Sequence, residues 1–180
     1  MTKAQVTWTG PGMRFVGETD TSPAIIIDSY GEYGTHSGPS PMELVLIGLA
    51  GCTAMDVVSI MEKKREPMTN LQIKIDADRA ENHPKVYTKI HLEYIAYGTG
   101  ISEKSLSRAI ELSEKRYCSV QAMLTKTAEI TSNFRIGYRW FPTRPFTFRI
   151  TGTAIPDTPF ARSTFDDFTA TVGTNSACFI

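Results

Sequence analysis

Two of the three cysteines in this chain lie where a thiol could take part in redox chemistry. Cys52 falls in the middle of an apolar segment, among small residues such as Gly51. Cys118 follows Lys115 and Arg116 at the predicted junction of two helices. Basic neighbours and a helix N-terminus would stabilise a thiolate there, and the thiolate is the nucleophilic form of cysteine. Two such thiols permit a peroxide-reducing cycle, in which one becomes a sulfenic acid and the other condenses with it to a disulfide.

Each cysteine also has an inert interpretation. A free cysteine is among the most buried residue types and packs as a small hydrophobic side chain. Gly48 and Gly51 beside Cys52 reduce helix propensity, which a helix tolerates where another helix or a substrate approaches its backbone closely. The sequence spacing of the two cysteines does not decide whether they meet, because disulfide geometry depends on the fold.

One segment is predicted as a long, buried helix. Ser40 is a suitable N-cap, Pro41 suits the first helical position, and Glu43 completes a capping box. The helix is expected to extend to about Arg65. Apolar side chains occupy nearly every side of it along residues 44–60, so the helix must be covered all round. This run is interrupted by polar residues and is predicted to be too short to span a bilayer.

The remaining elements predict an α+β fold. Turn-forming residues between short apolar segments indicate an N-terminal β-meander, and strict apolar–polar alternation indicates an antiparallel hairpin. A second, more polar helix should have one solvent-exposed face. The expected elements are meander strands near 6–8 and over 24–28, with turns at 10–12 and 18–23, hairpin strands at 71–77 and 86–94, a helix from 102 towards 117, a short helical turn at 119–124 and a closing strand at 127–135.

The last quarter of the chain differs in composition. Residues 138–180 contain no Lys and no Glu but hold seven of the nine phenylalanines. Four prolines there interrupt any continuous element. We therefore divide the chain into a domain at residues 1–136 and a C-terminal extension of unknown structure at residues 137–180, and we assign no role to Cys178.

The overall composition excludes several classes of partner. The chain has 180 residues, of which 41% are hydrophobic, and 19 Lys and Arg balance 19 Asp and Glu. A net charge of zero provides no basic field for nucleic acid or an anionic membrane, so neither is expected as a partner. The N-terminus lacks the apolar core of a secretory signal and the three cysteines are scattered, which predicts a cytoplasmic protein.

Three segments of the sequence together resemble a known family. They are GPSPMEL at 38–44, LAGCTAMDVV at 49–58 and RYCSV at 116–120. In these motifs, and in the order of elements from Lys3 to Ile136, the chain resembles the OsmC/Ohr family of osmotically inducible and organic hydroperoxide resistance proteins, in its YhfA-like branch. The resemblance implies an intertwined homodimer, with two central helices wrapped by sheets from both chains and two active sites at the interface. Such a dimer would cover a helix that is apolar on all sides.

The resemblance also implies an activity and roles for four residues. Cys52 matches the peroxidatic cysteine and Cys118 the resolving cysteine of a thiol peroxidase that reduces organic (alkyl or lipid) hydroperoxides. Arg14 matches an N-terminal arginine of the family, and Glu43 a glutamate at the start of the central helix. A guanidinium would lower the pKa of the thiol and bind the peroxide oxygens. The implied reductant is an external dithiol, in the family a lipoyl-bearing protein, and no metal, flavin or haem cofactor is required.

Glu43 departs from the family pattern. The family's glutamate lies ten residues before the peroxidatic cysteine, a place that Met42 takes here, whereas Glu43 lies nine residues before Cys52. Nine residues make two and a half helical turns, so Glu43 could serve only the Cys52 of a partner chain. Its alternative role is the capping box with Ser40. The departure leaves open a second function, the non-catalytic binding of an apolar small molecule at the dimer interface.

Two further signals in the sequence are weaker. Asp56 lies four residues after Cys52 on the same helical face, where it could tune the thiol or hydrogen-bond a neighbouring strand. His36, His83 and His91 are widely separated, so no metal site is expected.

Overall fold

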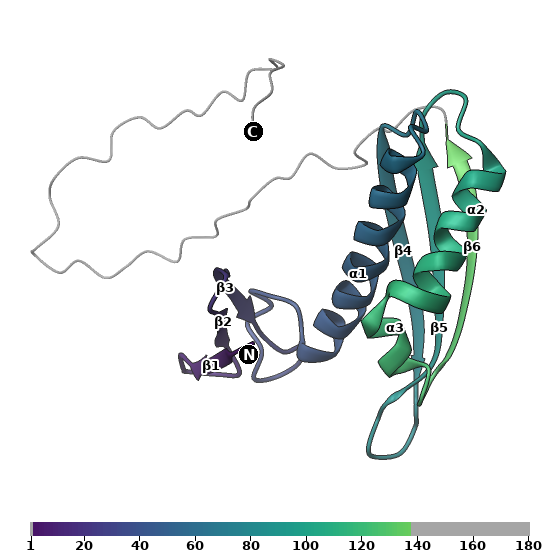
Figure 1. Ribbon diagram of the computed structural model, residues 1–180. Helices are drawn as coiled ribbons and strands as arrows, with labels where there is room; N and C mark the ends of the chain where they lie inside the picture. Colours follow the sequence, from purple (N-terminus) through teal and green to yellow (C-terminus); the bar gives the residue numbers. More distant parts are fainter. Residues whose placement is uncertain (1, 138–180) are drawn as a thin grey trace, which may run out of the picture. The chain divides into compact units, whose positions relative to one another are not determined.

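The computed structural model describes residues 2–137 and has the predicted α+β architecture (Figure 1). Its strands form two three-stranded sheets, and the helices lie along one face of the second sheet. The elements are β1 (Ala4–Trp8), β2 (Phe15–Thr19), β3 (Ser22–Ile27), α1 (Pro41–Lys63), β4 (Asn70–Arg79), β5 (Tyr87–Tyr97), α2 (Glu103–Leu112), the π-helical turn η1 (Ser113–Tyr117), α3 (Ser119–Leu124) and β6 (Glu129–Gly137).

The first sheet is the predicted antiparallel meander, in the order β1-β2-β3. Gly10 and Gly12 form the turn after β1 with φ angles of 28° and 84°, a backbone conformation that favours glycine. β2 has no counterpart among the predicted strands, because Gly17 and Glu18 break the alternation of a half-buried strand. Residues 18–23, predicted as a turn, contain the end of β2 and the start of β3, so that part of the prediction is wrong.

α1 begins as the sequence predicts. The Ser40 side chain accepts a hydrogen bond from the Glu43 N–H at 3.3 Å, and the Glu43 carboxylate accepts one from the Ser40 N–H at 2.8 Å. Pro41 occupies the first turn, where its missing N–H costs no helical hydrogen bond. The capping box is therefore confirmed.

α1 ends at Lys63, slightly before the predicted position. The reason is Arg65, which adopts a left-handed backbone conformation with a φ of 56°. The N–H of Glu66 then donates to the carbonyl of Met61 at 3.1 Å, which satisfies one of the last helical carbonyls.

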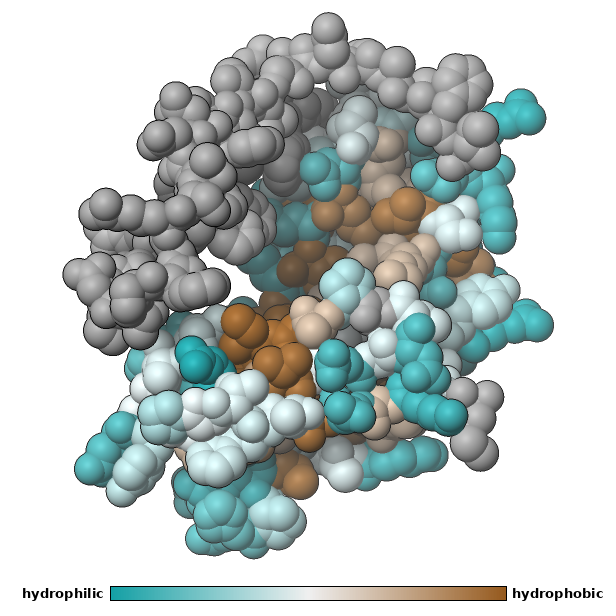
Figure 2. All heavy atoms as spheres, turned by 90° about the vertical axis from the view of Figure 1, so that its left-hand side faces the viewer, coloured by the Kyte–Doolittle hydropathy of each residue, from teal (hydrophilic) through white to brown (hydrophobic). Residues whose placement is uncertain are grey.

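The surface of α1 is more apolar than the other residues in the described part of the chain bury. The buried residues of the helix are spaced four apart and form one stripe, made of Leu49, Thr53, Val57 and Met61. On other sides Ile47 is 57% and Met55 76% exposed. Figure 2, which views the molecule from the left of Figure 1, shows apolar side chains reaching the surface. The helix therefore has the apolar surface on several sides that the sequence predicts, but residues 2–137 fully bury only one stripe of it.

By length and composition alone, α1 could cross a membrane. The helix has 23 residues, is mostly apolar, and is buried only in part among the described residues. The prediction that this apolar segment is too short to span a bilayer is therefore wrong. Core helices of other folds pass the same test, and α1 packs against β4, α2, η1 and α3.

The second sheet has the order β4-β5-β6. β4 and β5 form the predicted antiparallel hairpin, in which Ile75 lies opposite Leu92. β6, the predicted closing strand, pairs with β5 in parallel, with Ile130 opposite Ile90. Parallel neighbours need a crossover connection, and the segment from α2 to α3 supplies it. Charged side chains such as Glu93 and Arg135, which pair at 2.9 Å, lie on the outer face of the sheet.

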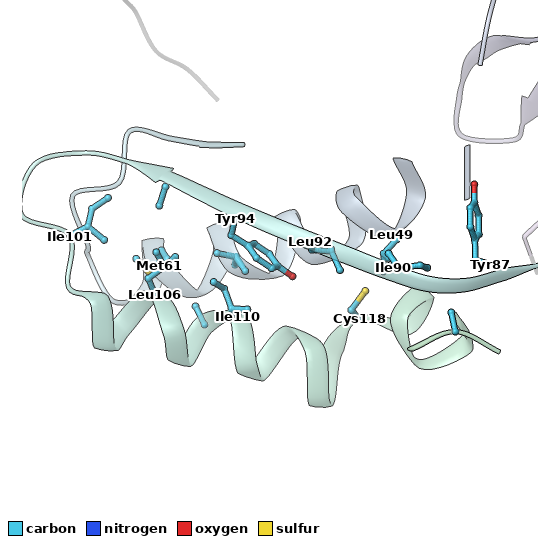
Figure 3. Close-up of a cluster of buried hydrophobic side chains, with 14 residues drawn as sticks. Leu49, Met61, Tyr87, Ile90, Leu92, Tyr94, Ile101, Leu106, Ile110 and Cys118 are labelled. Atoms are coloured by element: carbon cyan, nitrogen blue, oxygen red, sulfur yellow. The ribbon is translucent and has the colours of Figure 1, made fainter. Parts of the chain in front are cut away.

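The core lies between this sheet and the helices (Figure 3). α2 buries Leu106, Ala109 and Ile110 and leaves its opposite side exposed, as the sequence predicts. The second helix is α-helical only as far as Leu112, because residues 113–117 form the π-turn η1. The residues of this core that come from α1 and β5 and are 0% exposed are Leu49, Val57, Met61, Leu92, Tyr94 and Ala96.

The predicted boundary between the two parts of the chain falls inside a strand. β6 continues to Gly137, which pairs with Tyr97, so the first residue assigned to the extension belongs to the sheet. Residues 138–180, and with them Cys178, lie outside the described part of the chain.

Candidate active site

Cys52 lies on α1 where the buried stripe meets the exposed side of the helix. Its neighbour Thr53 is fully buried and Met55 is largely exposed, while Cys52 itself is half-buried. A Cβ atom added at Gly48 or Gly51 would meet no described residue within 4 Å. The small residues before Cys52 therefore leave open space beside it, and packing within the described residues does not explain them.

Cys118 lies at the junction of η1 and α3, as predicted, and it is 3% exposed. Its sulfur accepts a hydrogen bond from the Gln121 N–H at 3.4 Å and caps α3. Its own N–H donates to the carbonyl of Ser113, five residues earlier, at 2.9 Å. Figure 3 shows Cys118 and Tyr94 directed into the layer between β5 and the helices.

The prediction of a stabilised thiolate at Cys118 is wrong. Burial and the neighbouring Cys52 thiol raise the pKa of the Cys118 thiol to about 11, despite the backbone N–H of Gln121. The nearby cations are engaged elsewhere, since Lys115 pairs with Glu111 at 3.0 Å and the Arg116 guanidinium lies 5.8 Å from the centre of the Tyr117 ring. Cys118 therefore keeps its proton at neutral pH.

The structure brings the two predicted cysteines together. Cys52 packs against the buried core cluster that contains Cys118 and is close enough to raise the pKa of the Cys118 thiol, and both cysteines are free. The pair is asymmetric, because Cys52 is accessible from outside the chain whereas Cys118 is buried and protonated. This asymmetry suits Cys52 to react with an external oxidant and Cys118 to react only with Cys52.

A buried polar cluster, which sequence analysis missed, lies behind the thiol pair. The Thr53 hydroxyl lies 2.8 Å from the Tyr94 hydroxyl, and the Ser113 hydroxyl lies 2.9 Å from the Thr53 hydroxyl and 2.9 Å from the Asp56 carboxylate. Burial raises the pKa of Tyr94 far above its ordinary value. Asp56 thus bonds to η1 rather than to a strand. A threonine in an otherwise apolar helical stripe is the one signal in the sequence that could have indicated this cluster.

Arg14 lies just after the turn that joins β1 to β2. Its Nε atom donates to the Thr9 hydroxyl at 3.4 Å. Among the described residues, no hydrogen bond or ion pair connects Arg14 with Cys52, Cys118 or Glu43. The structure of a single chain therefore does not bring this predicted residue to the thiol pair.

Glu43 is fully engaged at the start of α1. One carboxylate oxygen accepts from the N–H and the hydroxyl of Ser40, each at 2.8 Å, and the other accepts from the Tyr30 hydroxyl at 3.0 Å. The hydrogen bonds from Ser40 lower the pKa of Glu43, so it is ionised at neutral pH. Within one chain its role is that of a helix cap, and it does not contact Cys52.

Asp28 organises the loop before α1 and was not singled out by the sequence. Its buried carboxylate accepts hydrogen bonds from Ser29 at 2.7 Å, from the N–H and hydroxyl of Thr35, and from the Ser37 N–H at 3.0 Å. These bonds, led by the Thr35 hydroxyl, lower the pKa of Asp28 far below its usual range. The signal was the Asp followed by Ser and Thr, which is typical of loops closed by side-chain to backbone bonds.

The histidines take no part in the site. His91 is hydrogen-bonded to the Thr131 hydroxyl at 2.8 Å on the outer sheet face, and the His36 ring lies 5.1 Å from that of Tyr30. Among residues 2–137, no three His, Cys, Asp or Glu side chains are grouped so that they could hold a metal ion.

Comparisons with known proteins match this architecture. The family model described as OsmC-like protein matches residues 34–133. Protein YhfA of Escherichia coli K12 is 37% identical over 134 residues, which are 74% of this chain and 97% of that protein. The chain belongs to the OsmC family. The resemblance found in the sequence and the predicted α+β fold are thereby confirmed.

Solved structures extend the OsmC-family match to three dimensions. The crystal structure of an Aquifex aeolicus VF5 protein has a TM-score of 0.67 and 29% identity, and the match covers 78% of this chain and 98% of that one. An organic hydroperoxide resistance protein, OsmC, of Legionella pneumophila shares the fold with a TM-score of 0.55 and 13% identity over 74% of this chain and 96% of that one. The OsmC family thus includes organic hydroperoxide resistance proteins.

Proposed function

We propose that this protein is a thiol peroxidase that reduces organic hydroperoxides, with Cys52 as the peroxidatic and Cys118 as the resolving cysteine. The observation that carries the proposal is that a half-buried thiol, Cys52, packs against the core cluster that holds a second, buried and protonated thiol, Cys118. Membership of a family that includes organic hydroperoxide resistance proteins supports it.

The cycle has three balanced steps. The Cys52 thiolate attacks the distal peroxide oxygen, the O–O bond breaks, and the alkoxide takes a proton and leaves as an alcohol. Cys118 then attacks the sulfur of the Cys52 sulfenic acid, so that an S–S bond forms, the S–O bond breaks, and the Cys118 proton leaves in water. An external dithiol, which we propose is lipoyl-bearing, reduces this disulfide by thiol exchange. A reducing cytoplasm would keep both thiols ready between turnovers.

The surroundings of Cys52 favour an apolar substrate. The open space at Gly48 and Gly51 and the exposed side chain of Met55 lie on the same helix. Such a lining would bind the hydrocarbon part of an alkyl or lipid hydroperoxide, whereas hydrogen peroxide has no apolar part. We therefore expect a higher kcat/KM for organic hydroperoxides than for hydrogen peroxide.

A homodimer would complete the site in this proposal. Arg14 and Glu43 contact neither cysteine within one chain, and the exposed apolar side of α1 borders Cys52. A second copy packed against that side would cover Ile47 and Met55 and could supply Arg14 to the peroxide. Glu43, whose carboxylate oxygens are already engaged, serves the helix cap and would at most hold such an arginine.

Titration of the reduced protein with cumene hydroperoxide tests the proposal. We expect the loss of two thiols per chain and a Cys52–Cys118 disulfide, identified by mass spectrometry of peptides. Cys52→Ser should abolish the reaction, because no peroxidatic thiolate remains. Cys118→Ser should react once and stop at a sulfenic acid that dimedone captures.

A contrary result would be equally clear. If both thiols stay reduced after excess hydroperoxide, the peroxidase proposal fails and the non-catalytic binding of an apolar molecule becomes the better explanation. For the reductant, dihydrolipoamide should reopen the disulfide faster than glutathione, since a dithiol completes the exchange within one molecule.

A further inference from the structure

Four polar side chains behind the thiol pair have no role in the proposed cycle. We name Thr53, Asp56, Tyr94 and Ser113 the buried polar cluster. Thr53, Tyr94 and Ser113 are each 0% exposed. Burying polar groups costs free energy unless they are hydrogen-bonded, and here each of the three is bonded to another member of the cluster.

The cluster connects the two elements that carry the cysteines. On α1, Thr53 is the residue next to Cys52 and Asp56 lies about one turn further on. The Ser113 hydroxyl of η1 is within hydrogen-bond distance of both of them, at 2.9 Å from each. The carbonyl of the same serine accepts the N–H of Cys118 at 2.9 Å. Ser113 therefore contacts α1 beside Cys52 through its hydroxyl and Cys118 through its carbonyl.

The π-turn makes this double contact possible. In an α-helix the N–H of Cys118 would bond to the carbonyl of Glu114, four residues back, but here it reaches Ser113, five residues back. The extra residue lets the Ser113 hydroxyl face α1 while Cys118 occupies the N-cap of α3. π-turns of this kind occur frequently at functional sites.

We propose that Ser113, held by Thr53 and Asp56, is a positioning residue for the disulfide-forming step. The inference rests on the proposed function. In that step the Cys118 sulfur must approach the Cys52 sulfur until an S–S bond of about 2.05 Å forms with a restricted dihedral angle. Attack on the peroxide by Cys52 needs no such approach from Cys118. Loss of the cluster should therefore slow the second step and spare the first.

The test compares the two steps in Ser113→Ala of the full-length protein. After mixing with cumene hydroperoxide, we expect sulfenic acid formation at Cys52 to stay within about twofold of wild type, and disulfide formation to slow at least tenfold. Dimedone should then capture the sulfenic acid in this variant but not in wild type. Ser113→Thr, which keeps the hydroxyl, should recover much of the rate. Ser119→Ala, at an exposed serine beside Cys118, is the matched control and should behave as wild type.

Closure by diamide separates this inference from the proposed function. Diamide oxidises a thiol pair without any peroxide, so it reports the placement of the cysteines even if hydroperoxides do not react. A wild-type rate of closure in Ser113→Ala with diamide overturns the positioning role. Equal slowing of both steps with hydroperoxide also overturns it, because it would indicate a purely structural loss. If Ser113→Ala does not fold, Asp56→Ala removes one of its acceptors, and Asp56→Asn, which retains an acceptor, is its control.

Discussion

The two sides of α1 are made of similar residues but have different surroundings. The stripe of Leu49, Val57 and Met61 is fully buried against the rest of the chain, while Ile47 and Met55 are mostly exposed. Both sides are apolar, so composition does not distinguish them. The difference teaches that the other described residues explain the inner side of this helix and do not explain its outer side.

Cys52 lies on the border between these two sides. On its inner side Cys52 packs against the core cluster that contains Cys118, and beside it Gly48 and Gly51 leave space that no described residue fills. A reactive thiol at such a border is held by core packing on one side and can be reached by a substrate on the other. The comparison can be tested on each side of the helix separately.

The largest effect is expected on the inner stripe. Leu49→Ala should lower the free energy of unfolding by about 3 kcal/mol, because it removes fully buried methyl groups and leaves a cavity. Urea unfolding followed by circular dichroism measures the change, which should be the same at every protein concentration. Met123→Ala, at a side chain that is 65% exposed, is the control and should change stability by less than about 0.5 kcal/mol. If both variants lose similar amounts of stability, the inner stripe of α1 does not have the special contribution to stability that we expect.

A second effect is expected on the outer side. Met55→Arg should leave the fold of each chain intact, because the side chain is 76% exposed, but it should weaken the proposed homodimer at least a hundredfold by placing an unpaired charge in the interface. Sedimentation velocity over a range of concentrations measures this change. If the wild-type protein is monomeric at all concentrations, the proposal that a second copy covers the outer side of α1 is wrong.

A smaller effect is expected from pH. The pKa of Cys118 is raised from its ordinary value of 9.0 to about 11 by burial and by Cys52. Between these values the unfolded chain loses the thiol proton and the native chain keeps it, so the stability of the reduced protein should fall as the pH rises from about 9 to about 11. Cys118→Ala should make this part of the stability profile less steep, as measured by urea midpoints, while the contribution of Tyr94, whose pKa is also raised by burial, stays. An unchanged slope would mean that another group titrates.

Local features of this protein were predictable from its sequence. The capping box at Ser40, the turn at Gly10 and Gly12, and the hairpin of β4 and β5 depend on residues close to one another in the chain. The position of Cys118 at a helix junction was predictable for the same reason. Each of these features follows from short-range hydrogen bonding or from alternation of apolar residues.

Features that depend on distant contacts were not predictable. The parallel pairing of β6, the π-turn η1 and the partnership of Ser113 with α1 all depend on packing between separate elements. The pKa of Cys118 was predicted in the wrong direction because burial outweighs the nearby cations, and burial is a property of the fold. Arg14 and Glu43 remain predictions whose test needs the assembled protein.

The parallel pairing of β5 and β6 also has a consequence for the order of folding. β4 and β5 are joined by a short connection, whereas β6 can pair only after the crossover of α2, η1 and α3 is in place, and closing a longer loop costs more entropy. We therefore expect β6 to dock late, which would fix Cys118 opposite Cys52 only near the end of folding. Pulses of oxidant during refolding should then trap this disulfide only after β6 becomes protected from hydrogen exchange. The topology would thus keep the newly made chain from closing its redox pair too early.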